Sequence, residues 1–296
     1  MSWILFALLA PVFYSVSAVI DNYLSDKLFR KTTSLIFYSF IFQLAILPIV
    51  FAIQRPTVPS LSLLPYFLIA GLCDVLYLYP YYKALQNDDT AVVNSLWAIC
   101  RVFVPIGAFF FIGEALAPIH YLGFLLVITS SVLLSHNGGR GVKFNRSLLY
   151  MVVACAIVSA EIVIYKHLLS NATWSTSYIG ATLAGFLLML PMLLIRKWRN
   201  GVTSQWQTFR TNFHWLGFEG LSTGAAAMSW TYAASLAPVS LVVGVGAVQP
   251  FIVLIFAVVF SGLFPKFFKE KISARQIVKK MALFAVTAIG VLLIAK

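Results

Sequence analysis

Hydrophobic residues occur along the chain in long runs that short polar stretches interrupt. An α-helix needs about 20 apolar residues to cross a bilayer, and most of the runs approach or exceed that length. Their unbroken character is typical of helices, because membrane-spanning strands alternate polar and apolar positions. The pattern predicts an all-α integral membrane protein with ten transmembrane helices, over residues 3–20, 33–53, 63–84, 90–112, 118–136, 147–166, 173–195, 213–235, 239–262 and 276–295.

The polar stretches divide these helices into two groups of five. The stretch His136–Gly141 lies near the middle of the chain, which predicts a first half over residues 1–136, a linker over 137–146 and a second half over 147–296. A shift of 149 residues aligns several identical small and apolar residues of the two halves. Two halves with an odd number of helices insert with opposite orientation, so we expect a 5+5 inverted repeat, a signature of transporters whose site lies between the repeats.

Composition excludes several classes of function. The chain is 61% hydrophobic and only 10% charged, with a mean hydropathy of +0.92. These values exclude a soluble enzyme and a nucleic-acid binder. The net charge of +12 is therefore assigned to loops at the surface of the lipid bilayer. Of the 21 Lys and Arg residues, 17 lie in alternate loops or their helix ends, so the positive-inside rule predicts that both termini face outward.

Short motifs recur in both halves. The first half contains Gly113-Glu114-Ala115-Leu116, and the second contains Glu270-Lys271-Ile272-Ser273; Ala237-Pro238-Val239 and Gln249-Pro250 join two helices of the second half. Their order and spacing resemble those of EamA-type transporters of the drug/metabolite transporter superfamily. The resemblance implies a 5+5 inverted repeat, a central cavity and alternating-access transport of small polar metabolites or amino acids, often as export. It also implies location in a bacterial inner membrane, with both termini in the cytoplasm. The distribution of Lys and Arg instead predicts that the termini face outward.

The chain departs from the family pattern at two prolines and one insertion. Asp89 and Arg101 stand in the first half where the second half has Pro238 and Pro250, and residues 263–269 are inserted in the second half.

Three ionisable residues lie well inside apolar runs. Asp74, Arg101 and Glu161 would each cost at least about 2.5–3.5 kcal/mol at the bilayer centre, so each is a functional candidate. Helical spacing places polar and aromatic residues on the same faces as these charges. Tyr14 shares a face with Asp21, Trp230 matches Tyr81 in the predicted repeat, and Gln249 lies beside Pro250. The candidate substrate-binding residues are therefore Tyr14, Asp74, Tyr77, Tyr81, Asn94, Trp97, Arg101, Glu161, Tyr165, Trp230 and Gln249.

The charges suggest roles for these residues. Asp74 and Glu161 exceed Arg101 by one charge, and desolvation favours the protonated form of a buried carboxyl group. Glu161, or Asp74, would then bind either a proton or a substrate ammonium, as in a proton-coupled antiporter. Arg101 would bind a substrate carboxylate, and the aromatic residues would hold the body of the substrate.

Structural roles remain open for the same residues. Asp74 and Arg101 could form only an ion pair, Glu161 could be a neutral acid bonded to a carbonyl group, and the aromatic residues could be packing residues. Glu114 is expected at a helix end as a clamp, Glu219 as a solvated residue at the membrane interface, and Lys166 as a family lysine or a snorkelling side chain.

The favoured function is a secondary transporter of a small polar, amino-acid-like metabolite, with export favoured. The alternative is a translocase of lipids or lipid-linked headgroups. Neither catalytic clusters nor metal-ligand spacing is present in the sequence, so we expect no enzyme activity, cofactor or metal. A monomer would be sufficient for transport, and a dimer is the alternative oligomeric state.

Overall fold

The structure is a computed structural model of the whole chain, and it describes residues 2–87, 93–94, 96–135, 146–263 and 274–294. The described residues form helices joined by short turns and contain no strand, so the predicted all-α fold class is confirmed for them. The principal helices are α1 (Ser2–Tyr23), α2 (Thr32–Gln43), α3 (Leu47–Ile53), α4 (Leu64–Leu76), α5 (Leu78–Leu85), α7 (Cys100–Ile112), α8 (Pro118–Ser135), α9 (Arg146–Asn171), α10 (Trp174–Met189), α11 (Arg196–Ser204), α12 (Trp206–Leu236), α13 (Val239–Val245), α14 (Gln249–Leu263) and α15 (Ala274–Ile294).

Each predicted run contains a helix or a series of short helices. By length and composition, five segments among the described residues could cross a membrane. These are Trp3–Leu28, Thr32–Ile53, Leu61–Leu85, Arg146–Asn171 and Trp174–Leu194. Shorter apolar helices cover other predicted runs, so the count of ten spans stays a prediction.

Local sequence accounts for several helix ends. Pro48 and Pro65 stand in the first turns of α3 and α4, where a missing backbone N–H has no cost. Thr173 caps α10 by accepting a hydrogen bond from the N–H of Thr176. Gly113 follows α7 with a φ of 68°, a left-handed conformation that favours glycine at a helix C-terminus.

The polar stretch from Arg196 to Asn212 is more helical than the sequence predicts. It contains α11 and the first turns of α12, which begins at Trp206 rather than at 213. Asn212 has non-helical angles (φ −117°, ψ 20°) and bends α12 there. The physical reason is that polar side chains allow a helix as readily as a loop once its other face packs against the bundle.

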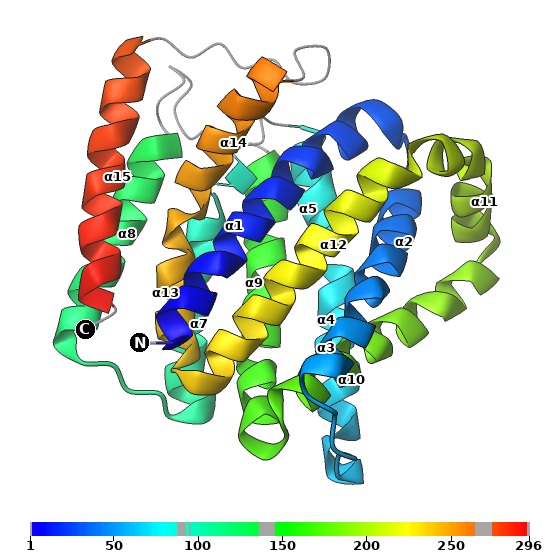
Figure 1. Cartoon of the computed structure of the whole chain (residues 1–296), viewed down its shortest axis with the longest axis horizontal. Coiled ribbons are helices and arrows are strands. Elements are labelled where there is room, and N and C mark those ends of the chain that lie inside the picture. The colour runs from blue at the N-terminus through cyan, green and yellow to red at the C-terminus, as the bar shows by residue number, and fades with distance from the viewer. Residues whose placement is uncertain (1, 88–92, 95, 136–145, 264–273, 295–296) are drawn as a thin grey trace.

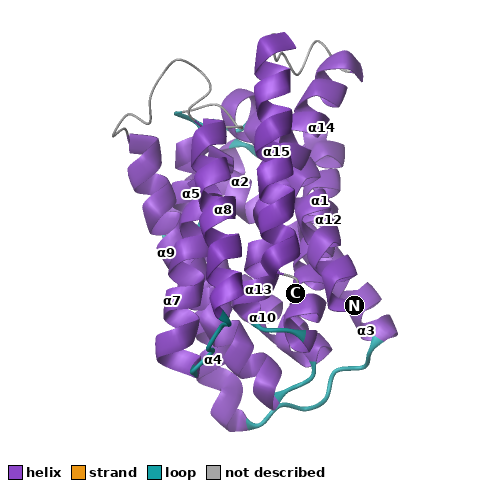
Figure 2. Ribbon diagram, turned by 90° about the vertical axis from the view of Figure 1, so that its left-hand side faces the viewer, coloured by secondary structure: helices purple, strands orange, loops and turns teal. Residues whose placement is uncertain are grey.

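The helices lie side by side as a bundle, with both termini toward the same end (Figures 1 and 2). Helix α1 packs along α12 in the centre, α4 and α5 pack against α9, α4 against α10, and α8 against α15. The centre therefore combines helices of both predicted halves.

Two breaks in the helices are spaced as the predicted repeat requires. A 3-10 turn over Trp97–Ile99 precedes α7, and another over Gly246–Val248 separates α13 from α14. The turns lie 149 residues apart, which is the shift that aligns the two halves. The inverted repeat as a whole stays a prediction, because no other observation tests it.

Candidate functional site

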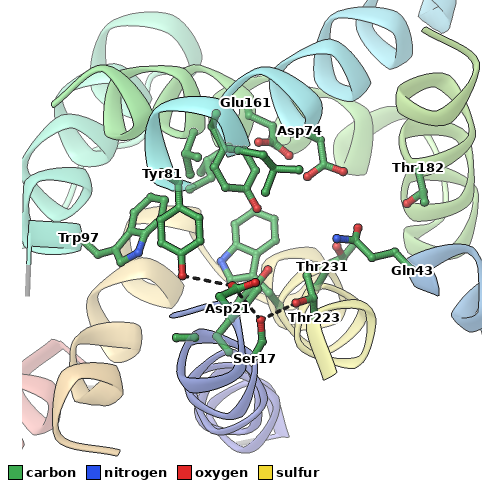
Figure 3. Close-up of a pocket in the computed structure, with 18 of the residues that line it drawn as sticks. Ser17, Asp21, Gln43, Asp74, Tyr81, Trp97, Glu161, Thr182, Thr223 and Thr231 are labelled. Carbon is green, nitrogen blue, oxygen red and sulfur yellow. Dashed lines mark hydrogen bonds between the residues drawn. The ribbon is translucent and has the colours of Figure 1, made fainter. Parts of the chain in front are cut away.

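A cavity of about 200 Å³ lies at the centre of the bundle, between helices of both predicted halves (Figure 3). Four of the chain's nine acidic residues line it, together with tyrosines, tryptophans and hydroxyl-bearing side chains. The described lining contains no Lys, Arg or His. The principal lining residues are Tyr14, Ser17, Asp21, Gln43, Asp74, Tyr77, Tyr81, Tyr82, Trp97, Glu161, Tyr165, Tyr178, Thr182, Glu219, Thr223, Trp230, Thr231 and Gln249.

The first acidic pair consists of Asp74 on α4 and Glu161 on α9. Their carboxyl groups lie close to one another at the cavity (Figure 3). Both side chains are half-buried, and neither carboxyl group makes a hydrogen bond or an ion pair with another residue that the structure describes. Two carboxyl groups so placed repel one another when both are charged. The pair is therefore open to a proton or a positively charged ligand.

The second acidic pair consists of Asp21 on α1 and Glu219 on α12, and both side chains are buried. The hydroxyl groups of Tyr82 and Tyr81 donate to Oδ1 and Oδ2 of Asp21 over 3.0 and 3.2 Å. The hydroxyl group of Thr223 donates to Oε1 of Glu219 over 2.8 Å. These donors stabilise negative charge on the pair.

Sequence reasoning missed this second pair as part of the site. Glu219 was expected to be solvated, but only 2% of its surface is exposed, so that expectation is wrong. The burial arises because α1 packs along α12 and covers the face that carries Glu219. Two signals were present: Asp21 shares a helix face with Tyr14, and Thr223 follows Glu219 by one turn.

Aromatic side chains form much of the wall between the two pairs. The ring of Trp97 lies 5.6 Å from that of Tyr81 and 6.1 Å from that of Tyr77, measured between centroids. On the other helices, Tyr165 and Trp230 meet edge to face at 5.9 Å. Aromatic faces attract cations, so the wall and the carboxyl groups favour the same kind of ligand.

Arg101 lies beside the cavity rather than in it. Its side chain is buried, and Nη2 donates to the carbonyl oxygen of Gly246 over 3.0 Å. Nη1 is buried without a hydrogen-bond partner among the described residues. The guanidinium group lines a smaller adjoining pocket that shares Tyr14, Trp97, Trp230 and Gln249 with the cavity. The ion pair of Asp74 with Arg101, one of the structural alternatives, is not formed among the described residues.

Nine of the predicted site residues line the cavity: Tyr14, Asp74, Tyr77, Tyr81, Trp97, Glu161, Tyr165, Trp230 and Gln249. Arg101 and Asn94 do not. Asn94 is buried, and its Oδ1 accepts a hydrogen bond from Nε2 of Gln249 over 3.5 Å. The 3-10 turn at Trp97–Ile99 explains the difference, because it interrupts the regular helical spacing from which one polar stripe was predicted.

Glu114 and Lys166 hold the connection between α12 and α13. The carboxyl group of Glu114 accepts hydrogen bonds from the backbone N–H groups of Val239 and Ser240, at 3.2 and 3.0 Å. Nζ of Lys166 donates to the carbonyl oxygens of Ala234 and Ala237. The expected clamp role of Glu114 is confirmed. Each charge also suits the helix end that it contacts, an anion at the start of α13 and a cation at the end of α12.

Comparison with known proteins finds a family similar to the first part of the chain. The sequence profile of the EamA-like transporter family matches residues 1–136. No curated protein matches the chain. One solved crystal structure superposes with a TM-score of 0.68 at 18% identity, covering 99% of this chain and 98% of the other, and at that identity the likeness shows the fold alone. The resemblance to EamA-type transporters is thereby confirmed over the first 136 residues, and the apolar helices indicate a multi-pass integral membrane protein.

Proposed function

We propose that this protein is a secondary active transporter of a small polar metabolite that carries a positively charged nitrogen, with amino acids in that class. The observation that carries the proposal is the pair of Asp74 and Glu161, two carboxyl groups at a central cavity with no hydrogen-bond or ion-pair partner among the described residues. Unpaired carboxyl groups at membrane depth are costly and mark substrate or proton pathways.

The cavity offers both ends of an amino acid a partner. An ammonium group would donate hydrogen bonds to Asp74 and Glu161 while its neighbouring carbon atoms contact Trp97 and Trp230. A carboxylate would meet the free Nη1 of Arg101 in the adjoining pocket. Arginine suits this role because its guanidinium group stays charged when buried.

Exchange of a proton for the ammonium would couple transport to a proton gradient. An empty pair of adjacent carboxyl groups keeps one proton, because two bare charges so close are unfavourable. Binding of an ammonium supplies the positive charge instead, and the proton leaves to solvent. One cation enters the site as one proton leaves, so the site never holds both. Antiport requires this exclusion, and it would allow proton entry to drive export.

The origin of the two carboxyl groups in different predicted halves supports alternating access. Asp74 lies on a helix of the first predicted half and Glu161 on a helix of the second. A movement of one half against the other would therefore change both the distance between the carboxyl groups and the side from which the cavity opens. The two 3-10 turns, 149 residues apart, provide equivalent bending points in each half.

Reconstituted vesicles test the proposal. The purified protein would be placed in liposomes with a pH-sensitive dye inside, and amino acids, amines and anionic metabolites would be added outside in turn. We expect alkalinisation of the liposome interior only with amine-bearing compounds, because each amine that enters releases a proton outward, and loss of the signal in Glu161→Gln and Asp74→Asn. Asp26→Asn, at an exposed carboxyl group, is the matched control and should transport normally.

Two results would overturn the proposal. The first is normal exchange by a folded Glu161→Gln and Asp74→Asn double variant. The second is transbilayer movement of fluorescent lipids without movement of any soluble amine, which would establish the lipid translocase instead.

A further inference from the structure

The binding of one positive charge does not account for the presence of Asp21 and Glu219 at the cavity. Asp74 and Glu161 already provide two carboxyl groups for one ammonium, yet Asp21 and Glu219 line the same cavity. No basic side chain among the described lining residues balances them. A second pair with no balancing cation requires a second positive charge, because isolated buried charge is strongly unfavourable.

The donors to the second pair are all hydroxyl groups, which carry no charge. Both oxygens of Asp21 accept a tyrosine hydroxyl, and Oε1 of Glu219 accepts the hydroxyl of Thr223. Oε2 of Glu219 is buried, and the hydroxyl group of Ser39 lies beside it as a further donor. Hydroxyl groups supply hydrogen bonds but no positive charge, so the two carboxyl groups still lack a balancing cation among the described lining residues.

The two pairs lie on corresponding helices, although the carboxyl groups themselves stand at different positions along them. Asp21 and Glu219 join α1 to α12, and Glu161 and Asp74 join α9 to α4. Under the 149-residue shift, α1 corresponds to α9, and the segment that contains α4 corresponds to α12. Each pair therefore takes one carboxyl group from each predicted half. In Figure 3, Asp21 lies on one side of the aromatic rings, whereas Asp74 and Glu161 lie on the other.

We infer that the cavity binds a dication, an aliphatic diamine with an ammonium group at each end. One ammonium group contacts Asp74 and Glu161, the other contacts Glu219 and Asp21, and the carbon chain lies against Tyr81 and Trp97. This inference rests on the proposed transport function and narrows its substrate class. When the diamine leaves, each pair takes up one proton. Two protons therefore cross the membrane in one direction for every dication that crosses in the other, and no net charge moves.

The unmodified protein in liposomes provides the first test. Exchange of a labelled diamine would be competed with unlabelled α,ω-diamines of increasing chain length and with monoamines of the same carbon number. We expect diamines to compete at least about tenfold better than the matched monoamines, since each gains a second charge-assisted contact. Competition should be best at one chain length, because two fixed pairs suit one spacing. Exchange should not respond to an imposed membrane potential.

A substitution at the second pair provides the second test. Glu219→Gln removes the charge while keeping the shape, and we expect the preference for diamines over monoamines to fall about tenfold, toward equality. Asp26→Asn, at an exposed carboxyl group, should keep the preference. Thermal unfolding of each variant in detergent checks folding, and the chain-length series on the unmodified protein decides the question if Glu219→Gln is unstable.

The outcomes separate this inference from the proposed function. Equal competition by diamines and monoamines, or a Glu219→Gln variant with full preference, overturns the diamine and leaves an amine transporter. Preference for amino acids with dependence on Arg101 overturns it in the same way. Absence of exchange with every amine overturns both.

Discussion

The contact between α4 and α10 is close enough to allow only glycine at two positions. A Cβ atom added at Gly71 would lie 2.6 Å from the carbonyl oxygen of Ala181 and 2.9 Å from the carbonyl carbon of Ala184, and it would also meet the backbone nitrogen of Gly185. One added at Gly185 would lie 2.9 Å from the carbonyl oxygen of Gly71 and 2.9 Å from Cζ of Phe40. All of these neighbours except Phe40 are backbone atoms, which cannot turn aside.

Gly71→Ala therefore forces the two helices apart. Overpacking of this kind costs about 1–3 kcal/mol, and the higher helix propensity of alanine returns only about 1 kcal/mol. Since the close neighbours are rigid backbone atoms, the cost lies at the upper end of that range. We expect a net loss of about 2 kcal/mol, which lowers the unfolding temperature by about 4–8 °C in a protein of this size. Because Asp74 follows Gly71 by less than one turn on α4, and Thr182 precedes Gly185 on α10, the same shift should weaken substrate binding.

Thermal unfolding followed by size-exclusion chromatography in detergent measures the effect. Gly107→Ala on α7 is the matched control, because an added Cβ there meets only a methyl group of Val163 at 3.2 Å, and its unfolding temperature should change little. Gly71→Ala combined with Gly185→Ala should cost less than the sum of the single changes, because the first already separates the helices. An unfolding temperature for Gly71→Ala equal to or above that of the unmodified protein would refute this reasoning.

Three further predictions concern other parts of the molecule. Glu114→Ala removes both acceptors at the start of α13 and should destabilise the protein by about 1–2 kcal/mol, as measured by thermal unfolding. Asp26→Asn should leave the stability unchanged. Equal unfolding temperatures for the two variants would contradict the clamp role of Glu114. Tyr82→Phe removes a buried donor to Asp21 and should cost about 1–3 kcal/mol, with Tyr79→Phe, at an exposed ring, as the neutral control. A C-terminal alkaline phosphatase fusion should be active and a C-terminal green fluorescent protein fusion dark in bacterial cells; the reverse would show that the positive-inside rule fails for this chain.

The sequence predicts most of the fold because bilayer length and backbone hydrogen bonding leave few choices. Apolar runs locate the helices, and charges inside them locate Asp74 and Glu161. Helical spacing alone could not find the second pair, since Asp21 lies near the end of α1 and Glu219 near polar residues of α12, where a solvated side chain is equally consistent with the pattern. Only the packing of α1 along α12 buries them. Arg101 was misplaced for a related reason: the 3-10 turn before α7 changes the direction of the residues that follow it.

The connection between α12 and α13 joins the acidic pairs to Arg101. Helix α12 carries Glu219, and Lys166 donates to the carbonyl groups at its end. Glu114 accepts from the N–H groups at the start of α13. Helix α13 leads to Gly246, whose carbonyl oxygen accepts a hydrogen bond from Arg101. Glu114 comes from the first predicted half, and Lys166 follows Glu161 on α9 of the second. A movement of one half against the other would therefore strain this connection at one of its two clamps. A movement of α9 that changes the spacing of Asp74 and Glu161 would also move Lys166 and the end of α12 that it holds. We therefore expect ligand binding at this pair and the position of Arg101 to change together.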